Sequence, residues 1–232
     1  MMPRMCGRYA SYKRDRLRPI EEALDQHLHI DPLPVRYNIA PSQPVIIVRP
    51  AAGAAFEAAL ATWGLVPAWS KEPKVGYSTI NARAENVAKS PAFRSAYRHR
   101  RCLVPADGFY EWHAVPGQKL KQPYFIRMAD DAPFAFAGLW ERWEREGMAL
   151  ESCSILTTEA NPLMASIHTR MPVILAPEDY RRWMQGDADA AAALLRPYQA
   201  ARMTAYRVST RVNSPRNDDE QCLEPLPAAG AG

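Results

Sequence analysis

Short apolar runs separated by prolines constrain the fold of this chain more than any other feature of its sequence. The chain carries 21 prolines in 232 residues. Each proline fixes its own φ angle and lacks a backbone N–H, so prolines favour turns and extended loops over long helices. The apolar runs between them have the length and composition of β-strands. Strands are predicted at residues 45–48, 56–63, 102–112, 124–128, 134–143, 152–157, 171–175 and 206–209.

Helical patterns are scattered between these strands. Apolar residues spaced three or four apart indicate one helical face, and a proline is tolerated in a first turn. Helices or helical turns are predicted at 17–29, 84–99 (restarting at Ser90-Pro91), 161–167, 177–185 and 188–195. The sequence contains neither an internal repeat nor a long linker. We therefore expect an α+β fold: a single domain with a curved, barrel-like, mostly antiparallel β core and peripheral helices.

The two ends of the chain differ in composition from the middle. Residues 227–232 read Pro-Ala-Ala-Gly-Ala-Gly and offer little to pack into a core. We expect the domain to span residues 5–223 and residues 224–232 to form a disordered tail. Residues 1–4 are either a leader or the result of a misassigned start.

Several classes of protein are excluded by what the sequence lacks. No apolar run approaches the roughly 18 residues that a membrane-spanning helix needs, and the basic N-terminus lacks the apolar stretch of a signal peptide. We therefore expect a cytoplasmic protein. The absence of a Gly-rich phosphate loop and of H-E-x-x-H and G-x-S-x-G patterns removes the commonest nucleotide-binding, zinc-protease and esterase interpretations. The four cysteines, Cys6, Cys102, Cys153 and Cys222, form no C-x-x-C pair, which argues against a zinc site and a disulfide framework.

The charge pattern favours nucleic acid weakly. Net charge is +4, and 23 of the 29 basic residues are Arg. Arg binds phosphate with two parallel hydrogen bonds and stacks on bases. A GC-rich coding sequence would also enrich Arg together with Ala, so the bias alone does not decide between the two.

Cys6 follows a methionine, Met5, that is itself a possible initiator. If translation starts there and Met5 is removed, the free α-amine and the thiol of Cys6 form a 1,2-aminothiol. Such a group captures an aldehyde first as an imine and then as a closed thiazolidine ring. An α-amine has a pKa of roughly 7.7–8.0, so part of it is neutral near pH 7. The alternative is a buried structural cysteine after an internal methionine.

Three further polar residues are candidates for chemistry, each with a structural alternative. Glu111 lies between two aromatic residues, where desolvation would raise its pKa and suit proton transfer; alternation alone instead turns Glu111 to solvent. His168 is a plausible general acid or a residue that caps a turn by hydrogen bonding. Asn81 would either orient a reacting group or cap a following helix.

Arginines accompany these candidates. Arg8, Arg83 and Arg170 each lie within two residues of a polar candidate segment, a pattern typical of a phosphate clamp. Aromatic and proline side chains near them suit the stacking of unpaired bases. For Trp63 we favour simple core packing.

These segments together resemble the SRAP family, the SOS response-associated peptidases or abasic-site processing proteins. The resemblance rests on an ordered set of motifs from residue 5 to about 223. They are MCGRY at 5–9, YNIAPSQ at 37–43, WGLVPAW at 63–69, NARAE at 81–85, RCLVPADGFYEW at 101–112, LTTEAN at 156–161 and HTRMP at 168–172.

The resemblance implies a function and a set of site residues. Family members recognise abasic sites in single-stranded DNA and attach to them covalently through the N-terminal cysteine. The implied catalytic residues here are Cys6, Asn81, Glu111 and His168, and the implied DNA-binding residues are Arg8, Asn38, Pro41, Trp69, Arg83, Thr157 and Arg170. It also implies a monomer that needs no cofactor or metal and joins the nucleoid when bound to DNA.

The N-terminus departs from the family pattern, which typically begins Met-Cys-Gly-Arg. We favour a misassigned start over self-processing of a leader. Two other functions stay open: a peptidase or amidohydrolase that uses a terminal Cys6 in trans, and a non-catalytic module that binds single strands.

Overall fold

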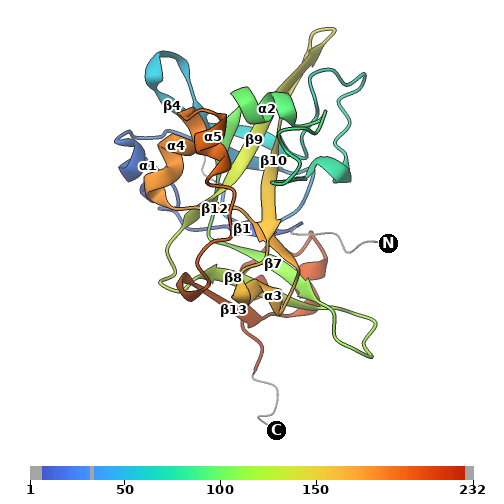
Figure 1. Cartoon of the computed structure of the whole chain (residues 1–232). Helices are drawn as coiled ribbons and strands as arrows, with labels where there is room; N and C mark the ends of the chain where they lie inside the picture. The colour runs from blue at the N-terminus through green and yellow to red at the C-terminus, as the bar shows by residue number, and fades with distance from the viewer. Residues whose placement is uncertain (1–6, 32–33, 228–232) are drawn as a thin grey trace.

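The computed structural model describes residues 7–31 and 34–227. At its centre, five strands close into a ring (Figure 1). Each strand of the ring pairs with the next, and the last pairs with the first; they are β3 (Pro44–Pro50), β4 (Phe56–Trp63), β10 (Met148–Glu159), β9 (Phe134–Arg145) and β6 (Arg101–Ala106). Only the β4–β10 pairing is parallel. The predicted barrel-like, mostly antiparallel core is therefore confirmed.

Strand β10 continues beyond the ring and carries a short strand on each edge. It pairs in parallel with β5 (Asn81–Arg83), where Thr157 lies opposite Arg83. It pairs antiparallel with β11 (Arg170–Pro172), where Thr157 lies opposite Pro172. The short strand β12 (Ile174–Leu175) pairs with β9. Strand β10 thus sets the register of two segments, β5 and β11, that the sequence places far apart.

A second, five-stranded antiparallel sheet contains the strand that follows the N-terminus. Its order is β13 (Met203–Arg207), β8 (Gln122–Met128), β7 (Gly108–His113), β1 (Tyr9–Ser11) and β2 (Arg36–Ile39). Gly108 allows β7 to begin tightly against β8, because a Cβ atom there would lie 2.2 Å from Cζ of Phe125 and 2.8 Å from the Ile126 carbonyl oxygen.

Aromatic packing joins the two sheets. The Tyr9 ring meets the rings of Trp63 and Phe136 edge to face, with centroids 5.4 Å and 5.8 Å away. Trp63 is fully buried, which confirms the core role predicted for it. Its indole Nε1 donates to the Ile80 carbonyl at 2.9 Å, so the same side chain anchors the backbone immediately before β5.

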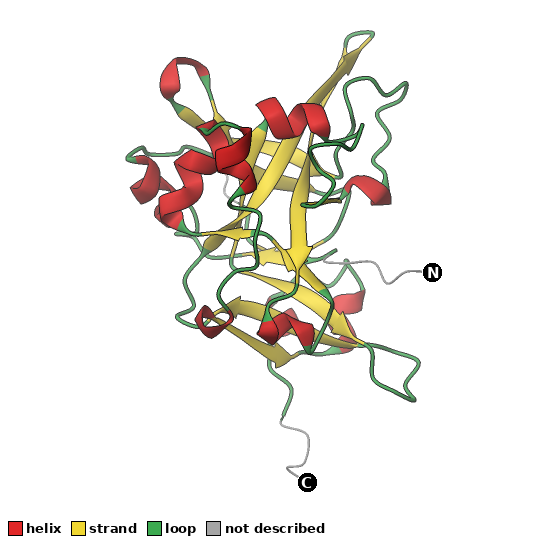
Figure 2. Ribbon diagram, in the orientation of Figure 1, coloured by secondary structure: helices red, strands yellow, loops and turns green. Residues whose placement is uncertain are grey.

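The helices are short and lie at the periphery (Figure 2). They are α1 (Arg18–Leu24), α2 (Arg94–His99), α3 (Pro162–Ala165), α4 (Tyr180–Gln185) and α5 (Ala188–Ala192). The prediction of a helix over 17–29 was too long, because Asp25 takes a left-handed conformation (φ 47°) that ends α1. The helix predicted over 84–99 was also too long, since residues 84–89 form turns and only α2 is helical. Within residues 7–31 and 34–227, no helix combines the length and apolar character needed to cross a bilayer.

The C-terminal segment is ordered further than expected. Pro225 forms a bridge with Val208, and the Leu226 N–H donates to the Arg207 carbonyl at 2.8 Å. The disordered tail predicted over 224–232 was therefore wrong for 224–226. Residues 228–232 lie outside the described residues.

Candidate functional site

Strand β1 fixes the attachment point of the candidate nucleophile. Cys6 itself lies outside the described residues, and Gly7 is the first residue that the structure describes. Tyr9 pairs with Phe109 of β7, and the Tyr110 N–H donates to the Arg8 carbonyl at 3.0 Å. The backbone that leads to Cys6 is thus held against the strand that carries Glu111.

Glu111 faces the interior of the protein. Its side chain is 1% exposed, and in β7 the residue lies opposite Tyr124 of β8. The Trp112 N–H donates to Oε1 of Glu111 at 3.3 Å. The solvent-facing alternative is therefore wrong: Tyr110 is buried as well, so both faces of β7 are covered and alternation alone misassigned the side chain.

A hollow of about 310 Å³ is lined by residues that are adjacent in sequence to three of the catalytic candidates. Its lining includes Gly7, Ile80 and Trp112, which adjoin Cys6, Asn81 and Glu111 in the chain. Arg8 and Pro41, two of the predicted DNA-binding residues, line it too. The hollow therefore brings together segments that lie about a hundred residues apart in sequence.

Asn81 begins strand β5 instead of preceding a helix. The capping alternative for Asn81 is therefore wrong. Its position is determined from two sides, because Ile80 accepts the Trp63 indole hydrogen bond and Asn81 pairs with Ile155 of β10.

His168 lies between α3 and β11, and its tautomer follows from its contacts. The Arg170 N–H donates to Nδ1 of His168 at 3.2 Å, so a neutral imidazole carries its proton on Nε2. Burial, and then the nearby Lys121 charge, lower the pKa of His168. Nε2 is buried and meets no hydrogen-bond partner among the described residues. His168 is thus a poised N–H donor, predominantly neutral near pH 7.

Three of the predicted DNA-binding residues meet at the end of β10. Arg83 is exposed and lies opposite Thr157. The Arg170 Nη2 donates to the Thr157 carbonyl at 2.8 Å and is 3.4 Å from its hydroxyl. Thr157 is fully buried, so its side chain contacts Arg170 and is not accessible to solvent.

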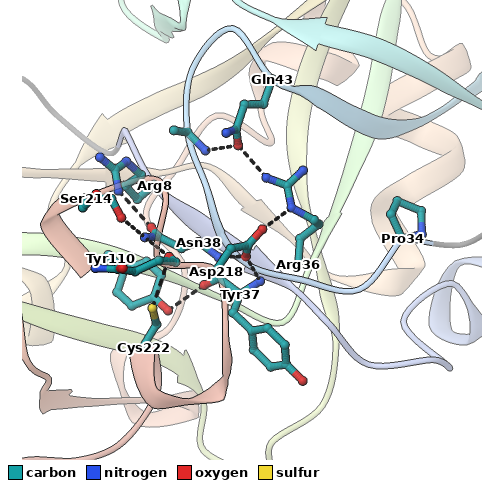
Figure 3. Close-up of polar contacts among 12 residues, drawn as sticks. Arg8, Pro34, Arg36, Tyr37, Asn38, Gln43, Tyr110, Ser214, Asp218 and Cys222 are labelled. Carbon is teal, nitrogen blue, oxygen red and sulfur yellow. Dashed lines mark hydrogen bonds and ion pairs between the residues drawn. The ribbon is translucent and has the colours of Figure 1, made fainter. Parts of the chain in front are cut away.

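Arg8 and Asn38 form one network with the C-terminal segment (Figure 3). Arg8 Nη1 donates to Oδ1 of Asn38 at 2.9 Å and to the Val212 carbonyl at 2.7 Å, and Nη2 donates to the Asn213 carbonyl at 3.0 Å. Asn38 is fully buried. The direct packing against DNA expected for the Asn38 side chain does not fit this burial; the side chain holds Arg8 instead.

The aromatic candidates differ in exposure. Trp69 is 65% exposed, in the loop between β4 and β5, and the adjacent Ser70 carbonyl accepts the Trp143 indole N–H at 2.9 Å. Sequence reasoning missed Tyr77, which is also 65% exposed and lines the hollow. An aromatic residue in a loop beside a polar segment was the only signal for it.

The described cysteines are poor nucleophiles. Cys102, Cys153 and Cys222 are buried and free, and burial raises the pKa of each thiol. In residues 7–31 and 34–227 no cluster of three or more His, Cys, Asp or Glu side chains is arranged to hold a metal ion.

The fold and site define a class: a β-barrel protein in which the two residues before β1, Gly7 and Arg8, line a hollow together with aromatic side chains. Comparisons with known proteins agree. The family model described as "SOS response associated peptidase (SRAP)" matches residues 5–215. The chain belongs to this family.

Relatives with curated names cover nearly the whole chain. The abasic site processing protein YoqW of Bacillus subtilis is 42% identical over 95% of this chain and 99% of its own length. The abasic site processing protein YedK of Escherichia coli is 31% identical over 96% of this chain and 100% of its own. A crystal structure of a Bacteroides thetaiotaomicron protein superposes with a TM-score of 0.82 at 26% identity, covering 95% of this chain and 100% of that one.

Proposed function

We propose that this protein processes abasic sites in single-stranded DNA by attaching covalently to them through Cys6. The observation that carries the proposal is the hollow, where the neighbours of Cys6, Asn81 and Glu111 meet beside Arg8. Membership of a family whose relatives are named abasic site processing proteins supports it. The activity belongs to a cytoplasmic monomer that joins the nucleoid when it binds DNA.

The DNA strand follows the exposed basic and aromatic side chains. Arg8, Arg83 and Arg170 hold phosphates around the lesion. Arg170 does so while it also keeps hydrogen bonds to the protein. Trp69, which is 65% exposed, and Pro41 at the hollow offer flat faces for unpaired bases. Asn38 and Thr157 are buried and act by positioning Arg8 and Arg170.

The reaction begins with ring opening. An abasic deoxyribose is mostly a closed hemiacetal, and a proton donated to its ring oxygen exposes the C1′ aldehyde. The Nε2–H of neutral His168 donates a hydrogen bond to the ring oxygen, and the proton that this oxygen takes up as its bond to C1′ breaks comes from the C1′ hydroxyl. The neutral α-amine of Cys6 then attacks C1′, and loss of one water molecule leaves an imine.

Ring closure completes the capture. The Cys6 sulfur adds to the imine carbon, the thiol proton passes to the nitrogen, and a thiazolidine forms. Glu111, buried beside the hollow, carries protons for water loss and for thiolate attack. Asn81 orients the sugar or Cys6 through its amide. An imine left open would permit β-elimination and strand cleavage, so closure protects the strand.

The chemistry requires Cys6 to be terminal. The family match begins at residue 5, which supports Met5 as the initiator. Intact mass spectrometry of the protein from its native host distinguishes chains that begin at Met1, Met5 or Cys6. A leader that is present at synthesis and lost on incubation of the purified chain would instead support self-processing.

An abasic single-stranded oligonucleotide tests the proposal. The mature chain is expected to give a heat-stable adduct on a denaturing gel, and Cys6→Ala none. Cys6→Ala keeps an α-amine, so adding borohydride should recover an adduct by reducing its imine. Cys102→Ala, which removes a buried thiol, is the matched control and should crosslink like the parent.

Three outcomes would contradict the proposal or support another function. The absence of an adduct from a chain verified to begin at Cys6 would contradict the proposal. Turnover of peptides or amides in trans, lost in Cys6→Ala, would point to a hydrolase. Binding that survives Cys6→Ala and ignores the lesion would indicate a non-catalytic single-strand binder.

A further inference from the structure

The C-terminal segment 212–218 is tied to Arg8 and to strand β2 by a set of polar contacts. Asn38 stands at their centre (Figure 3). Its Nδ2 lies within hydrogen-bond distance of three carbonyl oxygens, at 3.1 Å from Val212, 3.0 Å from Ser214 and 2.7 Å from Asn217. Its Oδ1 accepts from Arg8. A buried amide with this many partners fixes one arrangement of both segments.

Asp218 secures the segment against β2. Its Oδ1 accepts the backbone N–H groups of Tyr37 at 2.6 Å and Asn38 at 2.8 Å, and its Oδ2 pairs with Nε of Arg36. Arg36 in turn donates to Oε1 of Gln43 at 2.7 Å, and Gln43 lines the hollow. Asp218 therefore fixes the backbone on which Asn38 stands.

The segment also reaches the hollow directly. Oδ1 of Asn213 accepts the indole Nε1–H of Trp112 at 2.7 Å, and Pro215 contributes to the lining. Trp112 follows Glu111 in β7. The C-terminal segment thus contacts both Arg8, two residues after Cys6, and Trp112, the residue after Glu111.

These contacts occupy some of the N–H groups of the Arg8 guanidinium and leave others for a ligand. Three hydrogen bonds from its two terminal nitrogens go to the protein, out of the five N–H groups that a guanidinium offers. Among the residues that the structure describes, no acceptor is found for the other two N–H groups, and Arg8 lines the hollow, where a ligand can accept from them. Its backbone is held by Tyr110, so Arg8 is fixed at both ends two residues after Cys6.

We infer that segment 212–218 is part of the reaction site, and that Asn38 and Asp218 are positioning residues for attack by Cys6. The inference rests on the proposed function. The family match ends at residue 215, so Asp218 lies outside the matched region. The segment prearranges Arg8 to hold the phosphate that aligns the abasic sugar with the terminal amine and thiol.

Two substitutions perturb the segment without removing bulk. Asp218→Asn turns an amide N–H₂ toward the Arg36 donor, or else toward the two backbone N–H groups. Asn38→Asp keeps the oxygen that accepts from Arg8 but sets a carboxylate oxygen against three carbonyls. Asp219→Asn is the matched control, because Asp219 is the next residue, pairs with Arg211 at the surface and caps residues 220–222.

The experiment measures single-turnover adduct formation over a range of abasic-DNA concentrations, with thermal unfolding of each variant alongside. We expect Asp218→Asn and Asn38→Asp to lower the rate at saturating DNA by roughly 10- to 100-fold, as misplacement of a reacting group does. Asp219→Asn should match the parent. The Arg8 Nη–H resonances should exchange faster with water in the two slow variants, because these groups make the hydrogen bonds to Asn38, Val212 and Asn213.

The outcomes separate the two ideas. A parent that crosslinks while Asp218→Asn and Asn38→Asp crosslink at the parental rate would overturn this inference and leave the proposed function intact. A parent that gives no adduct would overturn the proposed function itself. The inference would also be overturned if crosslinking slowed only in proportion to the loss of thermal stability, and by the same proportion in Asp219→Asn. A merely structural role predicts that pattern.

Discussion

Glu85 and Arg170 form a bidentate ion pair at the end of β10. Arg170 Nη1 donates to Oε1 of Glu85 at 2.7 Å, and Nη2 donates to Oε2 at 2.9 Å. The Arg170 side chain is 16% exposed and that of Glu85 is 51% exposed. The hydrogen bonds from Arg170 hold the pKa of Glu85 below its ordinary value. A guanidinium proposed to hold DNA phosphate therefore already has a carboxylate partner.

Removing that partner should tighten DNA binding. Glu85→Gln is expected to raise non-covalent affinity for single strands, measured in a Cys6→Ala background, because Arg170 no longer exchanges a carboxylate for a phosphate. The slope of log affinity against log salt should steepen by up to about 0.7, the value for one added phosphate contact on a single strand. Glu159→Gln removes an exposed carboxylate opposite Arg170 and should change affinity less; equal effects would refute a specific pair.

Glu111→Gln should slow chemistry without weakening binding. Loss of a proton carrier is expected to lower the single-turnover crosslinking rate by roughly 10²- to 10⁴-fold. The dissociation constant for abasic DNA should stay at the parental value, because the buried side chain does not face the strand. Glu141→Gln is the matched control: Glu141 is also buried on a strand and accepts the N–H of the following residue at 3.0 Å. Equal slowing in both variants would contradict the role of Glu111.

The lowered pKa of His168 gives stability a pH dependence of known sign. The unfolded chain binds a proton at this site near the ordinary value of about 6.5, and the folded chain only at lower pH. Neutral His168 therefore contributes its full share to the free energy of unfolding above a pH of about 6.5, and that share is lost as the pH falls toward the folded-state pKa. His168→Asn keeps an acceptor for the Arg170 N–H, and its unfolding free energy should fall less between pH 7 and pH 5.

His29→Asn, at an exposed position, is the matched control for the loss of an imidazole. At the level of activity, His168→Asn should slow adduct formation on closed abasic sugar. A pre-opened aldehyde substrate should react at the parental rate, and a defect of equal size on both substrates would contradict ring opening as its task.

Thiol reactivity should be confined to one cysteine in the folded protein. Burial raises the pKa of the thiols of Cys102, Cys153 and Cys222, so these groups stay protonated and covered at neutral pH. Native labelling with a maleimide, read by mass spectrometry, should modify Cys6 only. Rapid labelling of any of the other three would show that the interior opens.

Gly108→Ala should destabilise the fold. The added Cβ would lie 2.2 Å from Phe125 and 2.8 Å from a backbone oxygen, so β7 and β8 must separate. Overpacking of this kind costs about 1–3 kcal/mol, a loss that calorimetry detects as a lower melting temperature. Gly76→Ala, where the closest atom would lie at an ordinary 3.4 Å, is the control and should melt like the parent.

The sequence specified the strands better than the helices. The run at 56–63 matched β4 residue for residue, because a strand's period of two is visible in a short segment. The helices over 17–29 and 84–99 were overextended. A left-handed residue such as Asp25 ends a helix through backbone geometry that apolar spacing does not record.

Side-chain direction at the site was harder to derive. Alternation along 108–113 cannot show that β7 is covered on both faces, so Glu111 could not be assigned from pattern alone. Tyr77 and Asp218 gave no periodic signal, since their roles depend on loops that meet only in the fold. The pairing of Arg170 with Glu85 joins residues 85 positions apart and had no local signature.

The contact between Arg8 and Val212 spans 204 positions. During synthesis, the beginning of the chain therefore waits for almost all of the remainder before it can take its final arrangement. A nascent chain that ends before residue 212 holds a complete set of barrel strands, but its Arg8 side chain still lacks the carbonyl groups of Val212 and Asn213. The order of synthesis thus makes the fixing of the Arg8 side chain one of the closing events of folding.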